Sequence, residues 1–431
     1  MIDSMKHSGR FLREDKSFMN IADYLTNKEA RLSDQAGRQR GSLPIPLGDY
    51  KLTFNRLPQF FDTVVSGATV EYGAGKRCHE MRTTTDGDYA IVQTFQNHNY
   101  FAGKSQFVEV TSFNFHDQPG IEKRYGYYSS GIVAPYQSNL DGFYLYSDGE
   151  THYLKIMNNG VEILNLPQSQ WDDPLDGTGS SKYAINWETF NVFQFSFLWL
   201  GGTGLRFSLV VGSRVIQVHD YSHIGSDNAD KLIFSRPSKP VRMEIIQTGE
   251  GSGLFEPVCS TVITEGSEAS GNIGEVLAVD SGVANNIQLS YPQRGVVKGV
   301  RLKPDCFCVV VDIMGVDTFA TSVNDFYRWE LVMNPNLVDG GGVDKVLTFT
   351  DIDGRAIQEA TGDGSTFAVG GVVIESGFGS SRTNISSPIE SARKIGSSIA
   401  GVADEIYLIV TPLQGTNNIQ VFGSINIKAF V

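Results

Sequence analysis

The 431-residue sequence has few cysteines, and none of them is arranged for a cysteine-rich site. The four, Cys78, Cys259, Cys306 and Cys308, show no CxxC spacing, which argues against a zinc site of paired cysteines and a disulfide scaffold. Cys306 and Cys308 would share one face of a strand, near the outer limit for a disulfide. We expect all four to be reduced, in a chain made in a reducing cytoplasm.

Two further absences concern membranes and nucleic acids. The chain has no run of about 18 apolar residues, and it does not begin with the charged and apolar regions of a secretory signal. We therefore predict neither a membrane span nor a Sec-type signal. The net charge of −13 argues against a nucleic-acid partner, because counterion release requires clustered Lys and Arg.

The composition instead favours short strands joined by turns. Forty-six glycines accompany many Val, Ile, Phe and Tyr residues, which predicts an all-β chain. The clearest period of two runs from Asn191 to Val218. Phe193, Phe195, Phe197 and Trp199 alternate in this stretch, so in a strand their rings share one face. We predict that this face is the inner wall of a sandwich.

Length and turn signals predict three parts. We expect a docking arm in residues 1–50, a jelly-roll sandwich in 51–250 and a smaller β-sandwich in 251–431, with the boundary at Gly249–Gly253. Many short strands cannot stay in one open sheet, which favours the sandwich. Asn159–Gly160 predicts a type I′ hairpin. Strands are expected in the last part at Pro257–Thr264, Gly295–Arg301, Cys306–Ile313, Arg328–Met333, Lys345–Thr350, Gly370–Glu375, Glu405–Thr411 and Gln420–Phe430, with a short helix within Ser387–Ile399.

The first 50 residues contain more Lys and Arg than Asp and Glu, so a slightly basic arm precedes an acidic body. Phe18–Leu25 fits a short amphipathic helix or an extended plug, and Gln35–Ser42 resembles a linker. Such a segment cannot bury a core by itself, so we expect a neighbouring protein or another copy to hold it. The predicted docking residues are Arg10, Phe11, Arg13, Phe18, Ile21, Tyr24, Leu25, Arg38 and Arg40.

Several motifs resemble ligand sites only in part. Gly73–Lys76 lacks the first glycine and the Ser or Thr of a phosphate loop. Asp351–Gly354 and Asp86–Asp88 favour β-turns, with a surface Ca²⁺ as the weaker alternative. His219 and His223 flank one carboxylate, but a third metal ligand is missing, so a hydrogen-bonded loop pair is favoured. We predict no cofactor and no metal ligand.

The sequence also lacks the acids of a sandwich-type glycan hydrolase. A strand carrying Glu-x-Asp-x-x-Glu would aim its carboxylates into one cleft, and no such run occurs. Glu244 and Glu250 are separated by Gly249 and do not share a strand face reliably. We therefore predict no catalytic residue. Tyr125–Tyr128 and Tyr144–Tyr146 could stack on sugars, but packing or an interface is the favoured role.

Four segments resemble structural proteins of tailed bacteriophages, a type that is frequent in marine phages. They are Ser8–Asp23, Asn191–His219, Val258–Gly266 and Arg328–Pro335. The aromatic block also resembles the laminin-G or concanavalin-like sandwich, a fold that lectins, adhesins and virion decorations share. The likeness rests on strand patterns and implies a virion component without fixing its position in the particle.

These observations together predict a non-enzymatic virion protein: a fibre, a tail-associated appendage or a head decoration. Its expected partners are other virion proteins and copies of itself, with a trimer favoured. Its expected location is the virion, after synthesis in the cytoplasm of the bacterial host. Two alternatives stay open. One is an adhesin that binds host surface glycan, and the weaker one is a glycan depolymerase.

Overall fold

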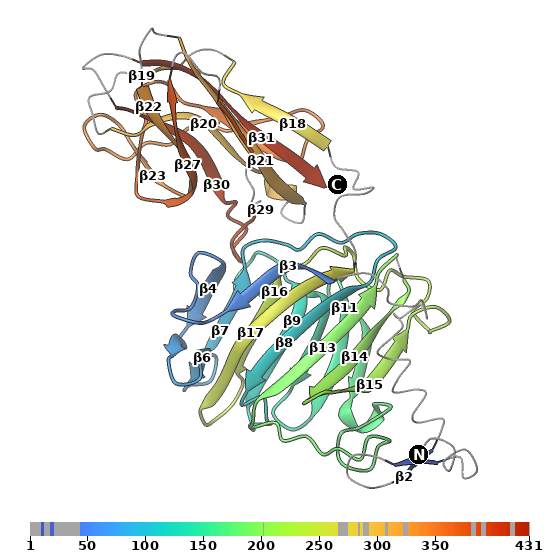
Figure 1. The fold of residues 1–431 in the computed structure, drawn as a ribbon. Coiled ribbons are helices and arrows are strands. Elements are labelled where there is room, and N and C mark those ends of the chain that lie inside the picture. The colour runs from blue at the N-terminus through green and yellow to red at the C-terminus, as the bar shows by residue number, and fades with distance from the viewer. Residues whose placement is uncertain are drawn as a thin grey trace. The chain divides into compact units, whose positions relative to one another are not determined.

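The computed structural model shows an all-β protein divided into two compact units (Figure 1). The first unit comprises residues 1–94 and 98–271, and the second comprises residues 95–97 and 272–431. The structure describes residues 10–12, 18–20, 44–200, 202–265, 275–282, 285–287, 293–306, 309–321, 326–380, 385–388, 394–413 and 419–430. The all-β class expected from the composition is thereby confirmed.

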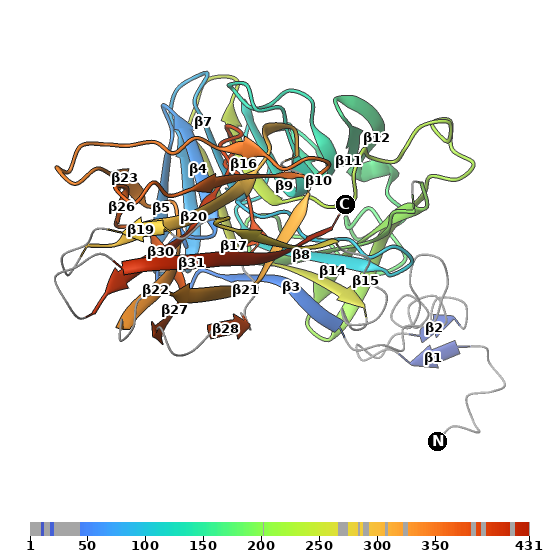
Figure 2. The same ribbon diagram turned by 90° about the horizontal axis from the view of Figure 1, so that it is seen from above.

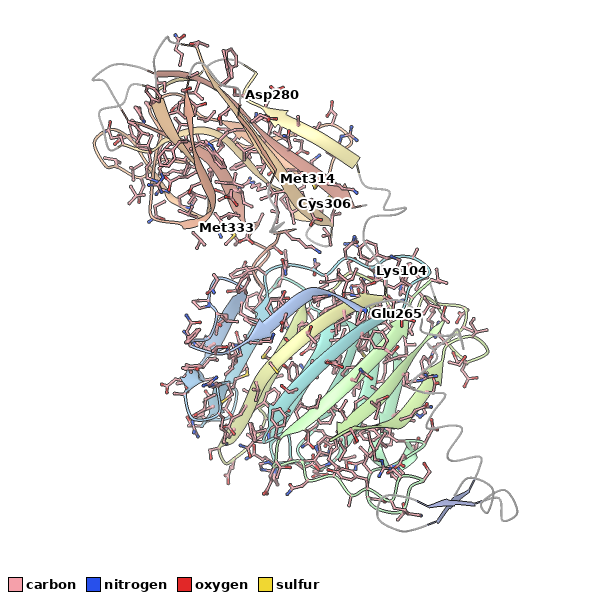
Figure 3. All side chains as sticks on the ribbon, in the orientation of Figure 1. Lys104, Glu265, Asp280, Cys306, Met314 and Met333 are labelled. Carbon is pink, nitrogen blue, oxygen red and sulfur yellow. The ribbon has the colours of Figure 1, made fainter. Side chains whose placement is uncertain are left out.

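The first unit contains a sandwich of two antiparallel sheets, whose side chains are drawn in Figure 3. The order across the seven-stranded sheet is β12 (Val161–Pro167), β11 (His152–Asn158), β10 (Asp141–Ser147), β9 (Ile121–Ser129), β16 (Val241–Gln247), β7 (Tyr89–Thr94) and β4 (Phe61–Ser66). The order across the other sheet is β15 (Arg214–Ser222), β14 (Gly204–Val211), β13 (Asn191–Leu198), β8 (Gln106–Phe113), β17 (Gly253–Glu265), β6 (Cys78–Thr83) and β5 (Thr69–Gly73), and β3 (Pro44–Lys51) pairs with β17. The predicted two-sheet sandwich is confirmed.

The aromatic side chains of β13 line the inside of this sandwich. Phe193, Phe195 and Phe197 are fully buried, because alternate positions of a strand point to the same face. The ring of Phe143, on β10 of the facing sheet, lies 5.2 Å from the rings of both Phe195 and Phe197. Trp199 follows the end of β13 and packs against the same core. The predicted inner wall is confirmed.

The hairpin between β11 and β12 has the predicted turn. Asn159 and Gly160 both have positive φ, at 45° and 86°. A type I′ turn needs positive φ at both central residues, which Asn tolerates and Gly adopts freely. The Asn-Gly pair therefore joins the two strands through the turn that matches their twist.

The arm and the domain boundary are both corrected by strand pairing. Residues 44–50, expected in the arm, belong to β3, which pairs with β17 in the first sandwich. Pro257–Thr264, expected to open the second sandwich, lies in β17, which pairs with β8 of the first. The predicted boundary at Gly249–Gly253 is therefore wrong for these strands. That segment joins β16 of one sheet to β17 of the other within one sandwich.

The second unit contains two more antiparallel sheets. Figure 2 shows β31 beside β21 in the first of them. The order across that sheet is β18 (Glu275–Asp280), β31 (Ile419–Phe430), β21 (Val310–Ala320) and β28 (Ile385–Pro388), with β19 (Asn285–Ile287) on β31 and β29 (Lys394–Ile395) on β21. The order across the other is β23 (Asn336–Val338), β26 (Phe367–Val369), β20 (Gly295–Leu302), β30 (Glu405–Pro412), β22 (Phe326–Met333) and β27 (Val372–Ser380), with β25 (Ile357–Thr361) on β20 and β24 (Thr350–Asp351) on β25.

Two strands expected in the second unit are wrong in detail. The strand expected from Cys306 begins at Val310, because Cys306 ends the short 3-10 helix η2 (Pro304–Cys306). Cys308 lies outside the described residues. Most of Lys345–Thr350 is irregular, and a strand starts only at Thr350. The short helix expected within Ser387–Ile399 stays a prediction, because residues 389–393 lie outside the described residues, and the described ones on either side are not helical.

Helices are scarce in the described part of the chain. Besides η2, it contains the 3-10 turn η1 (Gln168–Gln170). No helix among the described residues has the length and apolar character needed to cross a membrane. Cys78, Cys259 and Cys306 form no disulfide among the described residues.

One buried histidine of the first sandwich is placed at a cost to stability. His79 on β6 is almost fully buried, with its ring 5.2 Å from that of Phe61, and neither ring nitrogen has a partner among the described residues. Burial lowers the pKa of His79 to about 3 from 6.5, and the positive charge of Arg56 adds to the shift. Between these two pH values unfolding takes up a proton, so acid favours the unfolded state.

Replacing His79 with leucine should stabilise the first sandwich. Removing unsatisfied ring nitrogens is expected to raise the free energy of unfolding at pH 7 by about 1–3 kcal/mol and to weaken its fall between about pH 6.5 and 3. Denaturant titrations at several pH values, followed by tryptophan fluorescence, measure both effects. His152→Leu is the control: its Nε2 lies 2.8 Å from the Phe115 carbonyl oxygen, so this substitution should destabilise. A loss of stability in His79→Leu would contradict the prediction.

Candidate functional site

Three of the nine predicted docking residues lie in described backbone. Arg10 and Phe11 are in β1 (Arg10–Leu12), and Phe18 is in β2 (Phe18–Asn20), so a helix starting at Phe18 is not formed there. The two strands pair only with each other among the described strands, with Leu12 opposite Phe18. The other docking residues lie outside the described residues: Arg13, Ile21, Tyr24, Leu25, Arg38 and Arg40. The docking role stays a prediction.

The motifs that partly resemble ligand sites have ordinary structural partners. Lys76 lies 2.6 Å from Glu256 Oε2 in an ion pair. Asp88 accepts hydrogen bonds from two backbone N–H groups of its own turn. Asp351 accepts a bond from Gln358 Nε2 at 2.8 Å. Each side chain is thus held by neighbours, and no group of three or more His, Cys, Asp or Glu in the described ranges is arranged to hold a metal ion.

The two histidines near the end of β15 also serve the local structure. His223 contacts the Tyr221 hydroxyl through Nδ1 at 3.0 Å and the Lys231 carbonyl oxygen through Nε2 at 2.8 Å. The Nδ1 of His219 lies 3.1 Å from a carboxylate oxygen of Asp172. The expected hydrogen-bonded role is confirmed for His223, and His219 has a carboxylate beside it.

A charged cluster occupies the outer face of the seven-stranded sheet, opposite to the core. Arg124 on β9 and Glu244 on β16 are direct partners in the strand register. Glu244 accepts bonds from Arg124 Nη1 at 2.7 Å and from Arg242 Nε at 2.5 Å. Arg124 also donates from Nη2 to Glu122 at 2.7 Å. Glu244 and Arg242 are both buried, so the cluster is a desolvated ion-pair network.

Both central charges of this network are stabilised. Burial by itself would raise the pKa of Glu244, but Arg242 and Arg124 outweigh it and hold that pKa below its ordinary value. Burial would lower the pKa of Arg124, yet the carboxylates around it, first Glu244, hold it above its ordinary value. Glu244 therefore remains a carboxylate near neutral pH. A carboxylate fixed in this way is a poor general acid.

The chain between β9 and β10 covers one side of the cluster. The backbone carbonyl of Tyr136, in this segment, accepts a bond from Arg242 Nη2 at 2.6 Å. A second nitrogen of Arg242 donates to Gln93 at 2.8 Å, and its guanidinium lies 5.7 Å from the ring centre of Tyr128. Arg242 thus links the sheet to residues 130–139.

The tyrosines singled out in the sequence mostly pack. Tyr125 and Tyr127 are buried in the core of the sandwich. Tyr128 and Tyr144 are buried on the outer side of the same sheet, with ring centres 4.6 Å apart. Tyr146 lies beneath cations, with Lys155 Nζ 4.7 Å from its ring centre. The packing role is therefore the one that these contacts support.

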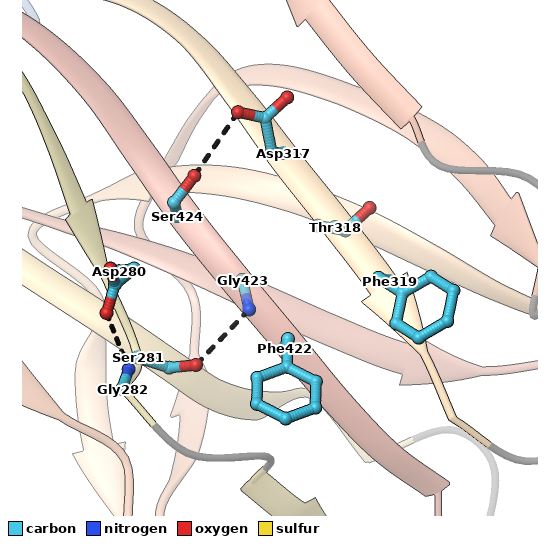
Figure 4. Close-up of a pocket in the computed structure, with 9 residues that line it drawn as sticks. All are labelled: Asp280, Ser281, Gly282, Asp317, Thr318, Phe319, Phe422, Gly423 and Ser424. Atoms are coloured by element: carbon cyan, nitrogen blue, oxygen red, sulfur yellow. Dashed lines mark hydrogen bonds between the residues drawn. The ribbon is translucent and has the colours of Figure 1, made fainter.

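A hollow of about 320 Å³ lies on the second unit, on the outer face of the sheet containing β18, β31 and β21 (Figure 4). Asp280, labelled on β18 in Figure 3, and Asp317 of β21 are both register partners of Ser424 on β31. Phe319 and Phe422 oppose each other further along β21 and β31, and each is 41% exposed. No local sequence pattern indicates this hollow, because its residues come from three strands that are distant in the chain.

Solved structures with a similar fold include several carbohydrate-binding or carbohydrate-cleaving proteins. A Bacillus licheniformis beta-glucanase matches 51% of this chain and 99% of its own, at 10% identity and a TM-score of 0.33. A carbohydrate esterase of the Shiga toxin-encoding bacteriophage phi24B matches 52% of this chain and 100% of its own, at 12% identity and a TM-score of 0.32. A legume lectin-like domain from Entamoeba histolytica matches 53% and 100%, at 10% identity and a TM-score of 0.32.

The first unit is a two-sheet β-sandwich, and the likeness to these structures covers about half of the chain. No family model and no curated protein sequence matches the chain. At these identities and TM-scores the likeness supports no conclusion about the activity of this chain. The activity of the chain has to be argued from its own residues.

Proposed function

We propose that this chain is a non-enzymatic structural component of a tailed-phage virion: a fibre, a tail-associated appendage or a head decoration, anchored by its N-terminal arm. The observation that carries the proposal is the pairing of the arm. Strands β1 and β2 form a sheet of their own, whereas β3 is the first strand to join a sandwich. An arm that contributes no described strand to the sandwiches is available to a neighbouring virion protein or to another copy, with a trimer favoured.

The charges on the first sandwich support a role without catalysis. A glycan depolymerase needs one carboxyl group that donates a proton and a second that acts as nucleophile or base. Glu244 and Glu122 both bind the same guanidinium, of Arg124, and the pKa of Glu244 is held low. These ion pairs favour a structural role for the acids. A glycan-binding adhesin stays the alternative, and an isolated fragment of residues 51–250 would then bind host surface glycan.

Removing residues 1–42 tests the anchoring role. The deletion ends before β3, which starts at Pro44, so the pairing of β3 with β17 is kept. The truncated chain should fold with an unchanged circular dichroism spectrum and unchanged melting. It should nevertheless be absent from particles that are produced when it is expressed in place of the full chain. Quantitative mass spectrometry of purified particles measures its copy number.

Two full-length variants separate the contributions of the arm. One replaces Phe11, Phe18, Ile21, Tyr24 and Leu25 with serine, which removes apolar contact area. The other replaces Arg10, Arg13, Arg38 and Arg40 with glutamine, which removes charge and should make incorporation less sensitive to salt. Incorporation of the truncated chain at the copy number of the full chain would overturn the proposal.

A further inference from the structure

We propose that the hollow between β18, β31 and β21 binds a neutral carbohydrate. The proposal goes beyond anchoring, because it assigns a ligand site to the second unit that does not depend on the arm. Figure 4 shows the hollow with both aromatic rings toward one end and Asp317 and Ser424 toward the other. A volume of about 320 Å³ lies within the range that small ligands occupy.

The two phenylalanines supply an apolar surface that the protein core does not use. Phe319 and Phe422 oppose each other on adjacent strands, so their side chains leave the same face of the sheet. Their neighbours Ala320 and Val421 point to the other face and are fully buried. Exposed rings side by side offer an apolar surface to the C–H faces of a sugar ring.

Polar groups adjoin this aromatic surface within the same hollow. Asp317 Oδ2 accepts bonds from Ser424 at 3.3 Å and Asn426 at 2.8 Å. Asp280 Oδ1 accepts the backbone N–H of Gly282 at 2.7 Å. Each carboxylate keeps a second oxygen without a partner among the described residues, and that oxygen can accept a bond from a ligand hydroxyl.

Charge and geometry select the class of ligand. Two carboxylates repel phosphate, sulfate and other anions, so the favoured ligand is a neutral donor of hydroxyl hydrogens. A metal ion is disfavoured, since these described residues bring together two carboxylates and no third acidic or imidazole ligand. A stable contact with another copy would bury about 1,200 Å² or more, whereas this site is a small hollow with polar groups inside it. The apolar face of a sugar ring fits the aromatic surface of the hollow, and the sugar hydroxyl groups fit its carboxylates.

A glycan array is the first test, using the full chain and a panel of neutral, sialylated and sulfated oligosaccharides. We expect retention on neutral glycans, followed by calorimetric titration with the glycan that is retained best. Combining Phe319→Ser with Phe422→Ser should weaken its binding by about tenfold or more, equivalent to about 1.4 kcal/mol. Asp317→Asn should also weaken binding, because the amide replaces an acceptor oxygen with a donor.

Phe378→Ser is the matched control, since Phe378 is an exposed phenylalanine of the same unit, on β27, and does not line the hollow. It should leave both binding and melting unchanged. Three results would overturn the proposal. The first is no retention on any neutral glycan, and the second is full retention by the double Phe variant. The third is sedimentation showing that the double variant abolishes self-association of a chain that binds no glycan.

These outcomes are independent of particle incorporation. A chain that binds glycan but is absent from virions would keep this proposal and remove the anchoring one. A chain that is incorporated through its arm but binds no neutral glycan would keep the anchoring proposal and remove the glycan-binding one.

Discussion

Replacing Glu244 with glutamine is expected to lower the free energy of unfolding of the first sandwich by about 3–5 kcal/mol. Glutamine keeps nearly the same shape but removes the charge that Arg124 and Arg242 share. Two guanidinium groups would then remain in a desolvated cluster without the central carboxylate. Denaturant titration followed by tryptophan fluorescence measures the loss, because Trp171, Trp187 and Trp199 belong to the first sandwich.

Glu122→Gln is the matched control for this substitution. Glu122 binds the same guanidinium, but its side chain is 23% exposed, whereas that of Glu244 is fully buried. Water screens a partly exposed ion pair, so Glu122→Gln should lower the free energy of unfolding by less than about 1 kcal/mol. Equal losses in the two variants would show that burial of the network does not govern its contribution. That result would contradict the prediction.

Replacing Phe197 with alanine should lower the free energy of unfolding of the first sandwich by about 3–5 kcal/mol, because it removes a fully buried ring and leaves a cavity. The ring centre of Phe197 lies 5.7 Å from that of Tyr100, 5.6 Å from that of Tyr127 and 5.2 Å from that of Phe143. Tyr127 and Phe143 belong to the facing seven-stranded sheet, and Tyr100 lies in the chain between β7 and β8. Strand pairing holds Tyr127 and Phe143 in place, so they cannot collapse onto the missing side chain. The same fluorescence titration measures the effect.

Phe54→Ala supplies the comparison for this cavity. Phe54 is 87% exposed, and removing an exposed side chain away from special features changes stability by about 0.5 kcal/mol or less. The loss of stability in Phe197→Leu should lie between the losses in Phe197→Ala and Phe54→Ala, since leucine fills part of the cavity. A loss under about 1 kcal/mol in Phe197→Ala would mean that the inner wall of β13 is more loosely packed than the structure indicates.

Sequence patterns correctly predicted those features of the fold that depend only on residues adjacent in the chain. Alternation at Phe193–Phe197 places the rings on one face whatever the partner strands are, and Asn159–Gly160 requires only its own backbone. The predicted boundary at Gly249–Gly253 is wrong because a glycine-rich segment can form a tight turn within a sandwich as well as a flexible spacer between domains. In the structure Gln247 Nε2 donates to the carbonyls of Gly249 and Gly251, both at 2.9 Å, and this turn joins two sheets of one sandwich.

Strand β3 was missed for a related reason. Its prolines Pro44 and Pro46 cannot donate backbone hydrogen bonds and argue against a central strand. The strand pairs only with β17 among the described strands, so its other edge needs no donors. Proline is tolerated on such an edge strand. The prolines can be recognised in the sequence, but whether their strand lies at an edge of the sheet cannot.

The candidate sites were harder to predict than the fold, because they depend on pairing between distant strands. Arg124 and Glu244 are 120 residues apart and meet only through the register of β9 and β16. The alternation of Arg242 and Glu244 along one strand was a usable signal for a charged face, but it did not identify Arg124 as the partner. Asp280, Asp317 and Ser424 come together in the same way.

The link between Arg242 and the Tyr136 carbonyl affects where the first sandwich can accept foreign sequence. A peptide inserted within residues 130–139 would pull the chain from a buried guanidinium and open the ion pairs to solvent. The turn between β14 and β15 contributes no residue to this ion-pair network. Gly212 in the turn is exposed, and the last buried residue of β14 is Leu209, so an insertion at Gly212 should leave the buried part of the strand unchanged. Tolerance to insertion, and with it the freedom of each loop to diversify, should therefore be very unequal among the loops of this sandwich.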